Sequence, residues 1–145
     1  MNNPQMTYKL KKSNYLPHQW AFLSSQAREC CLVGGFGSGK TFTFLRKAFI
    51  AMISKKNIDG KSKGWVLYPT YADGEDLFFH PFCALLDKYS IPYTPKISKL
   101  EIHTAYGYIK VMSMERPDRM VGAELTWAGA DEFDVAPYDR GNRVF

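Results

Sequence analysis

The sequence predicts a single α/β domain, because strand-like and helix-like segments alternate along the chain. An apolar segment, a glycine loop and a helix-periodic segment follow one another, and a second apolar segment precedes a second helical one. The composition agrees, since 46% apolar and 23% charged side chains in 145 residues are typical of a globular protein. We expect residues 1–14 to form an exposed lead-in and residues 15–145 to form the domain.

Proline, glycine and apolar spacing predict the first elements. Pro17 suits the first turn of a helix over residues 17–27, which carries an apolar stripe at helical spacing. Residues 30–33 are apolar and predict a short, fully buried strand. A glycine-rich loop over residues 34–39 follows it, and apolar residues recur at helical spacing from residue 40 to 53.

The second half repeats the alternation and adds a hairpin. We expect a strand over residues 65–68, a loop over 70–74, and a helix over 75–89 that Pro81 kinks or splits. Two further segments flank a short glycine turn and predict a β-hairpin, which is followed by a strand of small and apolar residues. These three strands are expected over residues 100–103, 108–114 and 125–130.

Composition also excludes several classes of protein. Three cysteines without paired CxxC spacing form neither a disulfide framework nor a zinc site, and the histidines show no mutual metal-ligand spacing. We expect Cys30 and Cys31 to be small buried hydrophobes. No apolar run approaches the roughly 18 residues of a membrane span, and the polar start lacks a signal-peptide core. The protein is therefore expected in the cytoplasm.

Charge is distributed unevenly along the chain. Residues 1–70 contain 11 Lys/Arg and 2 Asp/Glu, whereas residues 71–145 contain 8 Lys/Arg and 12 Asp/Glu. A basic half can attract polyphosphate or nucleic acid, or it can be an ordinary solvated lysine surface. Charge alone does not decide between these two interpretations.

The strongest signal is the string GGFGSGKT, a complete match to the phosphate-loop pattern GxxxxGK[ST]. It lies between a predicted strand and a helix, where backbone N–H groups and the helix dipole favour an anion. We expect Lys40 to contact the β- and γ-phosphates of a nucleotide and the Thr41 hydroxyl to ligate Mg²⁺. The alternative is a glycine turn that only caps the helix. The predicted ATP-binding residues of this loop are Gly34, Gly35, Phe36, Gly37, Ser38, Gly39, Lys40 and Thr41.

An acidic pair ends the last predicted strand. The carboxyl ends of parallel strands share one edge of a sheet, so Asp131 is expected near Thr41 as the second residue that holds the metal. Glu132 would orient and deprotonate an attacking water as general base. The alternative is a pair of ordinary loop carboxylates at a strand end.

Three further side chains are candidates on weaker grounds. Gln19 offers an amide donor and acceptor that could pair with the N6/N7 edge of adenine, although surface glutamines are common. Arg116 and Arg119 precede the acidic strand, and either could stabilise charge on a transferring phosphoryl group. Both arginines alternate with acidic residues, so a solvated loop is the alternative.

The segments LPHQW, GGFGSGKT, YPT and MERPDRMVGAELTWAGADEFD together resemble the amino-terminal ATPase domain of phage terminase large subunits, the motors that package viral DNA. The likeness spans about residues 15–134. It implies a three-layer α/β/α P-loop NTPase of the additional-strand (RecA-like) type. The β-hairpin precedes the Walker B strand, which is the strand that ends in the acidic pair. It also implies that Gln19 contacts adenine and that Lys40, Thr41, Asp131 and Glu132 have the roles given above.

This sequence departs from the family pattern in two respects. Many terminases carry an arginine where this chain has Phe36. The resemblance also implies that Arg119 matches an arginine that family members offer to a neighbouring subunit. The chain also lacks the coupling motif, the rest of the ATPase sheet and the nuclease domain, so the fold is expected to be incomplete. We interpret the chain as the N-terminal part of a P-loop ATPase domain, a fragment.

The resemblance implies Mg²⁺ as cofactor, with ATP as substrate. It implies double-stranded DNA as a partner and, in the full-length protein, like subunits in a ring, a portal protein and a small terminase subunit. No membrane partner is expected, and the cytoplasm of an infected bacterial host is the expected location. Two alternatives stay open: a helicase-type ATPase lobe, and a non-catalytic nucleotide-binding assembly fragment.

Overall fold

The computed structural model describes residues 9–133, and the chain divides into two compact units, residues 1–43 and 44–145. The first unit holds the short 3-10 helix η1 (Lys12–Asn14), α1 (Pro17–Ser24) and the start of α2 (Lys40–Ser54). The remaining elements are, in chain order, β1 (Ser62–Tyr68), α3 (Tyr71–Gly74), the π-helix η2 (Glu75–Phe79), α4 (His80–Lys88), β2 (Tyr93–Lys96), the 3-10 helix η3 (Ile97–Lys99), β3 (Glu101–Thr104), β4 (Gly107–Ser113), the 3-10 helix η4 (Pro117–Met120) and β5 (Trp127–Ala130).

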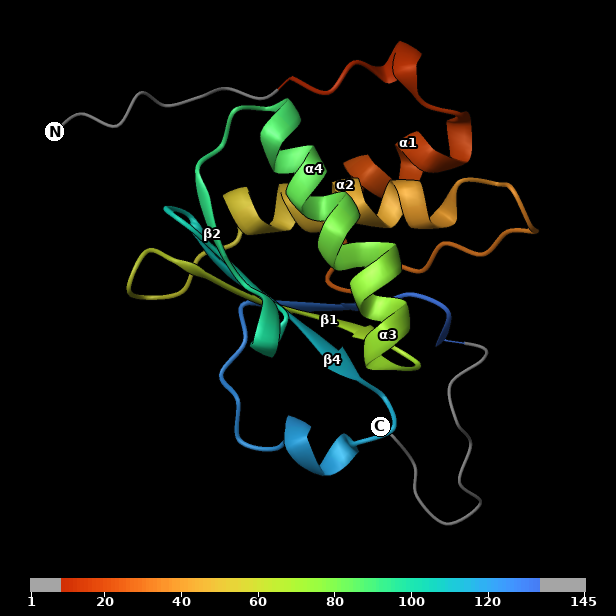
Figure 1. Ribbon diagram of the computed structural model, residues 1–145. Helices are drawn as coiled ribbons and strands as arrows, with labels where there is room; N and C mark the ends of the chain where they lie inside the picture. Colours follow the sequence, from red (N-terminus) through yellow and green to blue (C-terminus); the bar gives the residue numbers. More distant parts are fainter. Residues whose placement is uncertain (1–8, 134–145) are drawn as a thin grey trace, which may run out of the picture. The chain divides into compact units, whose positions relative to one another are not determined.

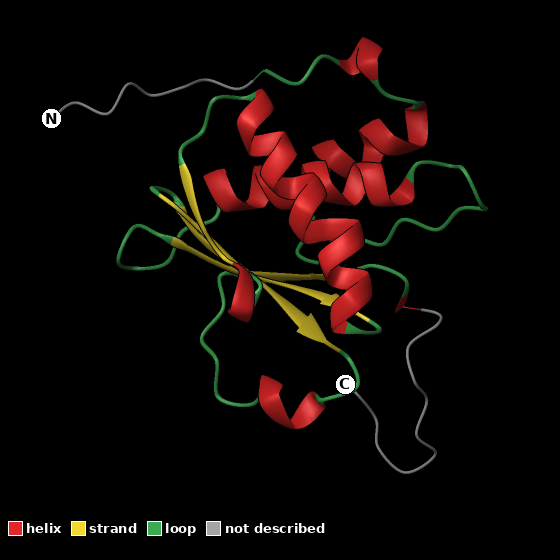
Figure 2. Cartoon of the chain, viewed as in Figure 1, coloured by secondary structure: helices red, strands yellow, loops and turns green. Residues whose placement is uncertain are grey.

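Within residues 9–133, five strands form one mixed sheet in the order β2-β3-β4-β1-β5. The strands are yellow in Figure 2. β1 pairs in parallel with β4 and with β5, whereas β2, β3 and β4 are joined antiparallel. Every residue of β1 except Lys63 is buried, as expected for an apolar strand between two parallel partners. The carboxyl ends of β1, β4 and β5 therefore lie along the same edge of the sheet.

Helices cover one face of this sheet, where α4 is seen in Figure 1. The ring of Phe44, in α2, lies 6.4 Å from Tyr68 of β1 and 6.0 Å from Phe78 of η2. Gly129 of β5 lies directly against Phe44, because a Cβ at residue 129 would be 2.6 Å from the ring. Aromatic rings in edge-to-face and tilted contact thus fill the layer between helix and sheet.

Residues 71–88 form one continuous helical run, so the prediction of a loop over residues 70–74 was wrong. The Thr70 hydroxyl accepts a hydrogen bond from the Asp73 N–H (3.1 Å), which lets the helix begin at Tyr71. The expected disturbance at Pro81 takes the form of a π-turn, in which the His80 N–H donates to the Glu75 carbonyl. A wider turn before a proline avoids the clash of its ring with the preceding turn.

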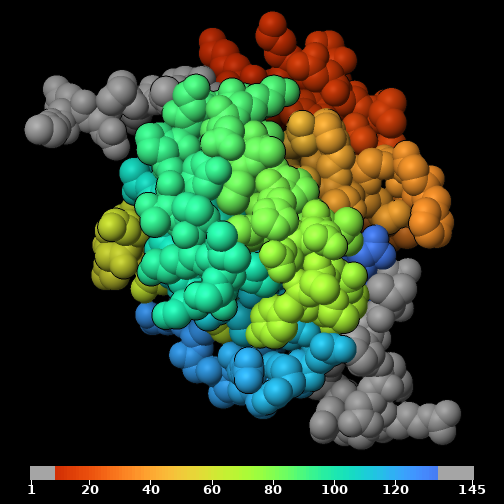
Figure 3. All heavy atoms as spheres, in the orientation of Figure 1, coloured from red at the N-terminus to blue at the C-terminus, as the bar shows by residue number. Residues whose placement is uncertain are grey.

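The opposite face of the sheet carries a sulfur-rich cluster. Trp65 and Leu67 of β1 pack with Met112 and Met114 at the end of β4, and Met120 and Leu125 of the β4–β5 segment cover them. This segment, with η4, is the light-blue part of the molecule in Figure 3. Within residues 44–133 this face has a 3-10 helix and no α-helix, so the three-layer arrangement stays a prediction.

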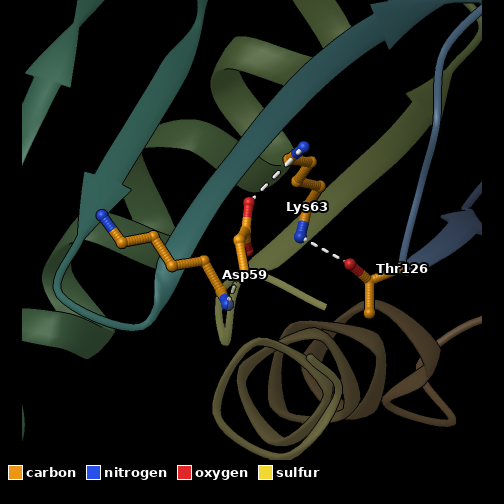
Figure 4. A network of polar contacts seen from close by, with 4 residues as sticks. Asp59, Lys63 and Thr126 are labelled. Carbon is orange, nitrogen blue, oxygen red and sulfur yellow. Dashed lines mark hydrogen bonds and ion pairs between the residues drawn. The ribbon is translucent and has the colours of Figure 1, made fainter. Parts of the chain in front are cut away.

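A polar contact fixes the start of β5 against the start of β1. The Lys63 N–H donates to the Thr126 hydroxyl (2.9 Å), and the Thr126 N–H donates to the Lys63 carbonyl (2.9 Å). The Lys63 ammonium lies 3.8 Å from the Asp59 carboxylate (Figure 4). Next to it, Gly64 leaves room for the Trp127 indole, which a Cβ at residue 64 would strike. These contacts set the register that carries β5 toward the acidic pair.

The predicted strand over residues 30–33 is not formed, and this prediction was wrong. Cys30 and Cys31 are exposed rather than buried, and Val33 is 87% exposed. An apolar run becomes a strand only when a neighbouring strand takes up its backbone N–H and C=O groups, and residues 9–133 contain no ladder pairing for it. Helix α1 also ends at Ser24, before the predicted end at residue 27.

The predicted hairpin is present as β3 and β4, in antiparallel register from Glu101↔Lys110 to Thr104↔Gly107. Strand β2, in contrast, was not predicted. It contains Pro95, which has no N–H for a ladder, and proline within a run argues against a central strand. β2 accommodates this residue because it lies at the edge of the sheet.

Candidate functional site

The glycine loop turns sharply into α2. Gly37 and Gly39 have φ angles of +72° and +77°, a left-handed conformation that glycine adopts without a steric penalty. The Ser38 N–H donates to the Gly35 carbonyl (3.3 Å), and the Thr43 N–H donates to the Gly39 carbonyl (2.9 Å) as the first turn of the helix forms. The glycine loop therefore leads into a helix as predicted, whereas the strand predicted before it is not formed.

The Lys40 side chain folds back over this loop. Its ammonium donates to the Gly34 carbonyl (2.7 Å) and to the Gly35 carbonyl (3.0 Å). The Lys40 ammonium thus lies at the beginning of the loop, next to the carbonyl of a residue six positions earlier in the sequence. Phe36 at the tip is fully exposed, and the buried Ser38 hydroxyl has no hydrogen-bond partner among residues 9–133.

Two side chains of α1 reach the same loop. The Gln19 amide nitrogen donates to the Ser38 carbonyl (3.3 Å), and the His18 ring nitrogen Nε2 lies 3.2 Å from the same oxygen. Gln19 also accepts a hydrogen bond from the Leu16 N–H (3.0 Å), and its side chain is buried. The structure therefore brings Gln19 to the glycine loop, and its contact with adenine stays a prediction.

The acidic pair belongs to the second unit and follows β5 directly. Asp131 is 8% exposed, and its N–H donates to the Leu67 carbonyl of β1 (3.1 Å). Its carboxylate accepts hydrogen bonds from the Tyr68 hydroxyl (3.3 Å) and from the Glu132 N–H (3.0 Å). Burial first, and the nearby Asp131 carboxylate second, raise the pKa of Tyr68 far above its usual range, so this hydroxyl remains a donor.

Glu132 has an unusual backbone. Its φ of +54° is left-handed, which is uncommon for a residue with a side chain and costs on the order of 1 kcal/mol or more. Its side chain is half-buried, next to a carboxylate that is almost fully buried. The two acids therefore differ in environment, which is what different chemical roles require.

Sequence reasoning missed the other polar groups of this sheet edge. The Ser113 hydroxyl, at the end of β4, donates to the Pro69 carbonyl (3.1 Å) and accepts from the Glu115 N–H (3.2 Å). Tyr68 ends β1 and is wholly buried, yet its hydroxyl is the one that meets Asp131. A tyrosine at the last position of a buried strand was the available signal, since a buried phenol needs a polar partner.

The two candidate arginines lie on η4 and its first flanking residue, and both are exposed. Arg116 lies 3.5 Å from the Asp118 carboxylate, and the Arg119 N–H donates to the Arg116 carbonyl (3.1 Å). The Arg116 pairing matches the expected solvated loop. The assignment of Arg119 as an arginine that acts on a phosphate stays a prediction.

A shallow hollow of about 250 Å³ lies elsewhere, lined by Pro92, Tyr93, Thr94, His103, Thr104 and Ala105. It includes none of the predicted site residues. Across residues 9–133, no three His, Cys, Asp or Glu side chains converge as a metal site. The helices of this part are also too short or too polar to cross a membrane.

The mixed sheet with a parallel centre and the helices packed on it define an α/β fold. Solved structures of bacteriophage large terminases, including isolated ATPase domains, align with this chain. The domain from Thermus phage P74-26 aligns with a TM-score of 0.66 at 22% identity, over 86% of this chain and 56% of that one. The large terminase of another thermophilic bacteriophage, in complex with ADP, aligns with a TM-score of 0.71 at 12% identity, over 85% and 33%.

An arginine-to-alanine mutant of the P74-26 domain aligns with a TM-score of 0.55 at 20% identity, over 71% of this chain and 47% of that one. No protein family model matches the sequence. No curated protein matches it either. The chain thus has the fold of phage large terminase ATPase domains and spans from about a third to about half of the solved chains.

Proposed function

We propose that this chain is part of the ATPase domain of a DNA-packaging motor of the large-terminase type. The observation that carries the proposal is the complete phosphate-loop motif at the start of α2, in a chain with the fold of terminase ATPase domains. One of those structures is a complex with ADP. The substrate proposed here is ATP, and the reaction is hydrolysis of its terminal phosphoanhydride bond.

The loop geometry supports phosphate binding. Left-handed glycines at positions 37 and 39 let backbone N–H groups turn toward one side of the loop and form a concavity for an anion. The Lys40 ammonium is held by two carbonyls of the same loop, so it reaches across the loop and would exchange those oxygens for phosphate oxygens. The positive end of α2 adds a favourable partial charge.

The proposed metal is Mg²⁺, and the oxygen donors present suit it. Mg²⁺ takes hydroxyl, carboxylate and water oxygens, and usually keeps several waters. Thr41 would contribute a hydroxyl and Asp131 a carboxylate, each oxygen of which accepts one hydrogen bond and keeps a further lone pair. When bound, the ion would neutralise charge on the phosphates. Glu132 is the proposed general base that takes the proton of the attacking water.

The partners proposed for the whole protein come from the terminase-like fold. They are double-stranded DNA, like subunits in a ring, a portal protein and a small terminase subunit, in the cytoplasm of an infected bacterium. Arg119 is proposed to act on the nucleotide of a neighbouring subunit. Its exposure on the short helix η4 supports this role, since a residue acting between subunits must be accessible in one chain.

The first test is Mg-ATP binding by calorimetry, with Lys40→Ala against the parent. Loss of the ammonium should weaken ATP binding at least tenfold, because charge-assisted hydrogen bonds contribute about 1.5–3 kcal/mol each. Lys56→Ala is the matched control, since Lys56 is an exposed lysine outside the loop. Equal ATP affinity of Lys40→Ala and the parent would refute the phosphate-loop assignment.

A further inference from the structure

Two side chains of α1 contact the Ser38 carbonyl in the glycine loop. This carbonyl accepts a hydrogen bond from the Gln19 amide (3.3 Å) and lies 3.2 Å from Nε2 of His18. These two donors are neighbours in the first turn of α1 and lie 19 and 20 residues before Ser38. Two side chains from one helical turn thus converge on one peptide group of the loop.

The oxygen and the nitrogen of the Gln19 side-chain amide both make hydrogen bonds within the protein. The oxygen accepts the Leu16 N–H (3.0 Å), which is one of the N–H groups at the start of α1, and the nitrogen donates to Ser38. The side chain is 7% exposed and packs so closely on Gly39 that a Cβ at residue 39 would collide with it. An amide that reads a base must offer a donor and an acceptor outward, whereas here the oxygen and the nitrogen each make a hydrogen bond within the protein and the residue is buried.

The peptide that these side chains hold controls a group of the proposed phosphate site. In a trans peptide the C=O and the following N–H point in opposite directions. Fixing the Ser38 carbonyl toward α1 therefore fixes the Gly39 N–H on the opposite side. Gly37 and Gly39, the residues on either side of Ser38, are left-handed glycines, so the backbone itself restrains this part of the loop weakly.

We infer that Gln19 and His18 are positioning residues that hold the Ser38–Gly39 peptide in its phosphate-binding orientation. This inference rests on the proposed nucleotide-binding function and changes the role of Gln19 within it. A residue that acts through the loop affects every ligand with a polyphosphate chain. A residue that reads adenine affects only ATP. A comparison of ligands with different bases, or with no base, therefore separates the two roles.

The test measures binding of Mg-ATP, Mg-GTP and inorganic tripolyphosphate with Mg²⁺ to the whole chain by calorimetry. Gln19→Ala should weaken all three by the same factor, about 5- to 10-fold, because one hydrogen bond to the loop is lost. Gln26→Ala, an exposed glutamine outside the loop, is the matched control and should leave all three unchanged. Weaker binding of ATP alone would overturn the inference and return Gln19 to adenine recognition.

Two further variants isolate the contact with Ser38. Gln19→Glu keeps an acceptor for the Leu16 N–H but has no donor at neutral pH and adds a negative charge, so it should lose at least as much polyphosphate affinity as Gln19→Ala while keeping α1. His18→Ala should weaken tripolyphosphate about 2- to 5-fold, and His18→Gln, which restores a donor, should recover most of that loss. Circular dichroism and urea midpoints report folding of each variant.

The outcomes distinguish this inference from the proposed function. If the parent bound none of the three ligands, the proposed function and this inference would both be refuted. If the parent bound all three and Lys40→Ala lost them, while Gln19→Glu and His18→Ala bound tripolyphosphate as the parent does, only the positioning role would fall. A double variant of His18 and Gln19 should lose less than the product of the single effects, because both act on one carbonyl.

Discussion

At the scale of single residues, the buried contact between Tyr68 and Asp131 determines how the acidic pair is presented. The tyrosine is wholly buried and donates to one carboxylate oxygen, while the Glu132 N–H occupies the other. The carboxylate is therefore held in one orientation at the end of β5. Glu132 follows with a left-handed backbone, a strained conformation of the kind that is concentrated at functional sites.

Glu132→Gln should separate binding from hydrolysis. The amide has nearly the same shape but cannot accept the proton of an attacking water, so ATP affinity should stay at the parent value. Turnover should fall by about 100-fold or more, the usual contribution of a general base. The measurement is steady-state phosphate release, in an assembly with measurable activity, beside calorimetric ATP binding.

Glu124→Gln is the control for this prediction, because Glu124 is an exposed carboxylate outside the acidic pair. It should leave turnover unchanged. Near-normal phosphate release by Glu132→Gln would assign the general base to another residue.

The sequence predicts those parts of the candidate site that are local in the chain. The glycine loop, Lys40 and the acidic pair are contiguous patterns whose chemistry follows from residue types and spacing. The contacts of Gln19 with Ser38 and of Tyr68 with Asp131 join residues 19 and 63 positions apart. No local pattern encodes such contacts, because they depend on how the elements fold together.

At the scale of elements, the same distinction explains which strands were predicted. The hairpin of β3 and β4 carries its own partner and a glycine turn, so its pairing is contained in one stretch of sequence. The apolar run of residues 30–33 contains no such partner, and it is not a strand in the structure. β2 has the reverse property, since its proline argues against a strand but its edge position permits one.

Packing between α2 and β5 depends on the absence of a side chain at Gly129. A Cβ there would lie 2.6 Å from the Phe44 ring, so Gly129→Ala should destabilise the protein by about 1–3 kcal/mol through overpacking. The measurement is the free energy of unfolding in urea. The double variant with Phe44→Leu should recover part of the loss, because the smaller side chain vacates the space. An unchanged urea midpoint in Gly129→Ala would contradict this account of the layer.

An ion-pair network on the hairpin predicts a pH dependence. Burial alone would raise the pKa of Glu101, but the hydrogen bonds and charges of His103 (2.9 Å) and Lys110 (3.3 Å) outweigh it and lower the pKa below its usual range. A lowered carboxyl pKa contributes stability that is present above the ordinary Glu pKa and is lost as pH falls through the folded value.

Lys110→Met should therefore cost stability at pH 7 and not at strongly acidic pH, where Glu101 is protonated. The expected difference at pH 7 is about 0.5 kcal/mol, as for a partly exposed ion pair. Urea titrations at both pH values measure it, with Lys56→Met as a control that should show no such difference. A loss of equal size at both pH values would mean that the lysine stem, and not its charge, stabilises the hairpin.

At the scale of the whole molecule, the two edges of the sheet differ. β2 forms one edge and carries Pro95 and Lys96, a residue without an N–H and a charged side chain, both of which discourage pairing with another strand. β5 forms the other edge within residues 9–133, and its sequence is WAGA, with exposed side chains at Ala128 and Ala130. Small uncharged residues leave that edge unprotected.

We therefore expect the chain to associate through β5 as its concentration rises. Light scattering over a concentration series should show growth in the parent, and Ala128→Lys should suppress it, because a charged side chain at an edge opposes strand addition. Ala84→Lys, which adds the same charge at an exposed position of α4, should associate as the parent does. Equal suppression by both substitutions would assign the association to net charge.

Phosphate release measured on the same samples tests whether ATP hydrolysis also depends on association. If Arg119 acts only on a neighbouring subunit's nucleotide, a dispersed chain binds ATP and hydrolyses it slowly or not at all, and turnover appears only in a properly arranged assembly. Ala128→Lys should then bind ATP as the parent does, as a clean monomer with little hydrolysis. Robust turnover by that monomer, unaffected by Arg119→Ala, would refute the action of Arg119 between subunits, because every group needed for hydrolysis would lie within one chain.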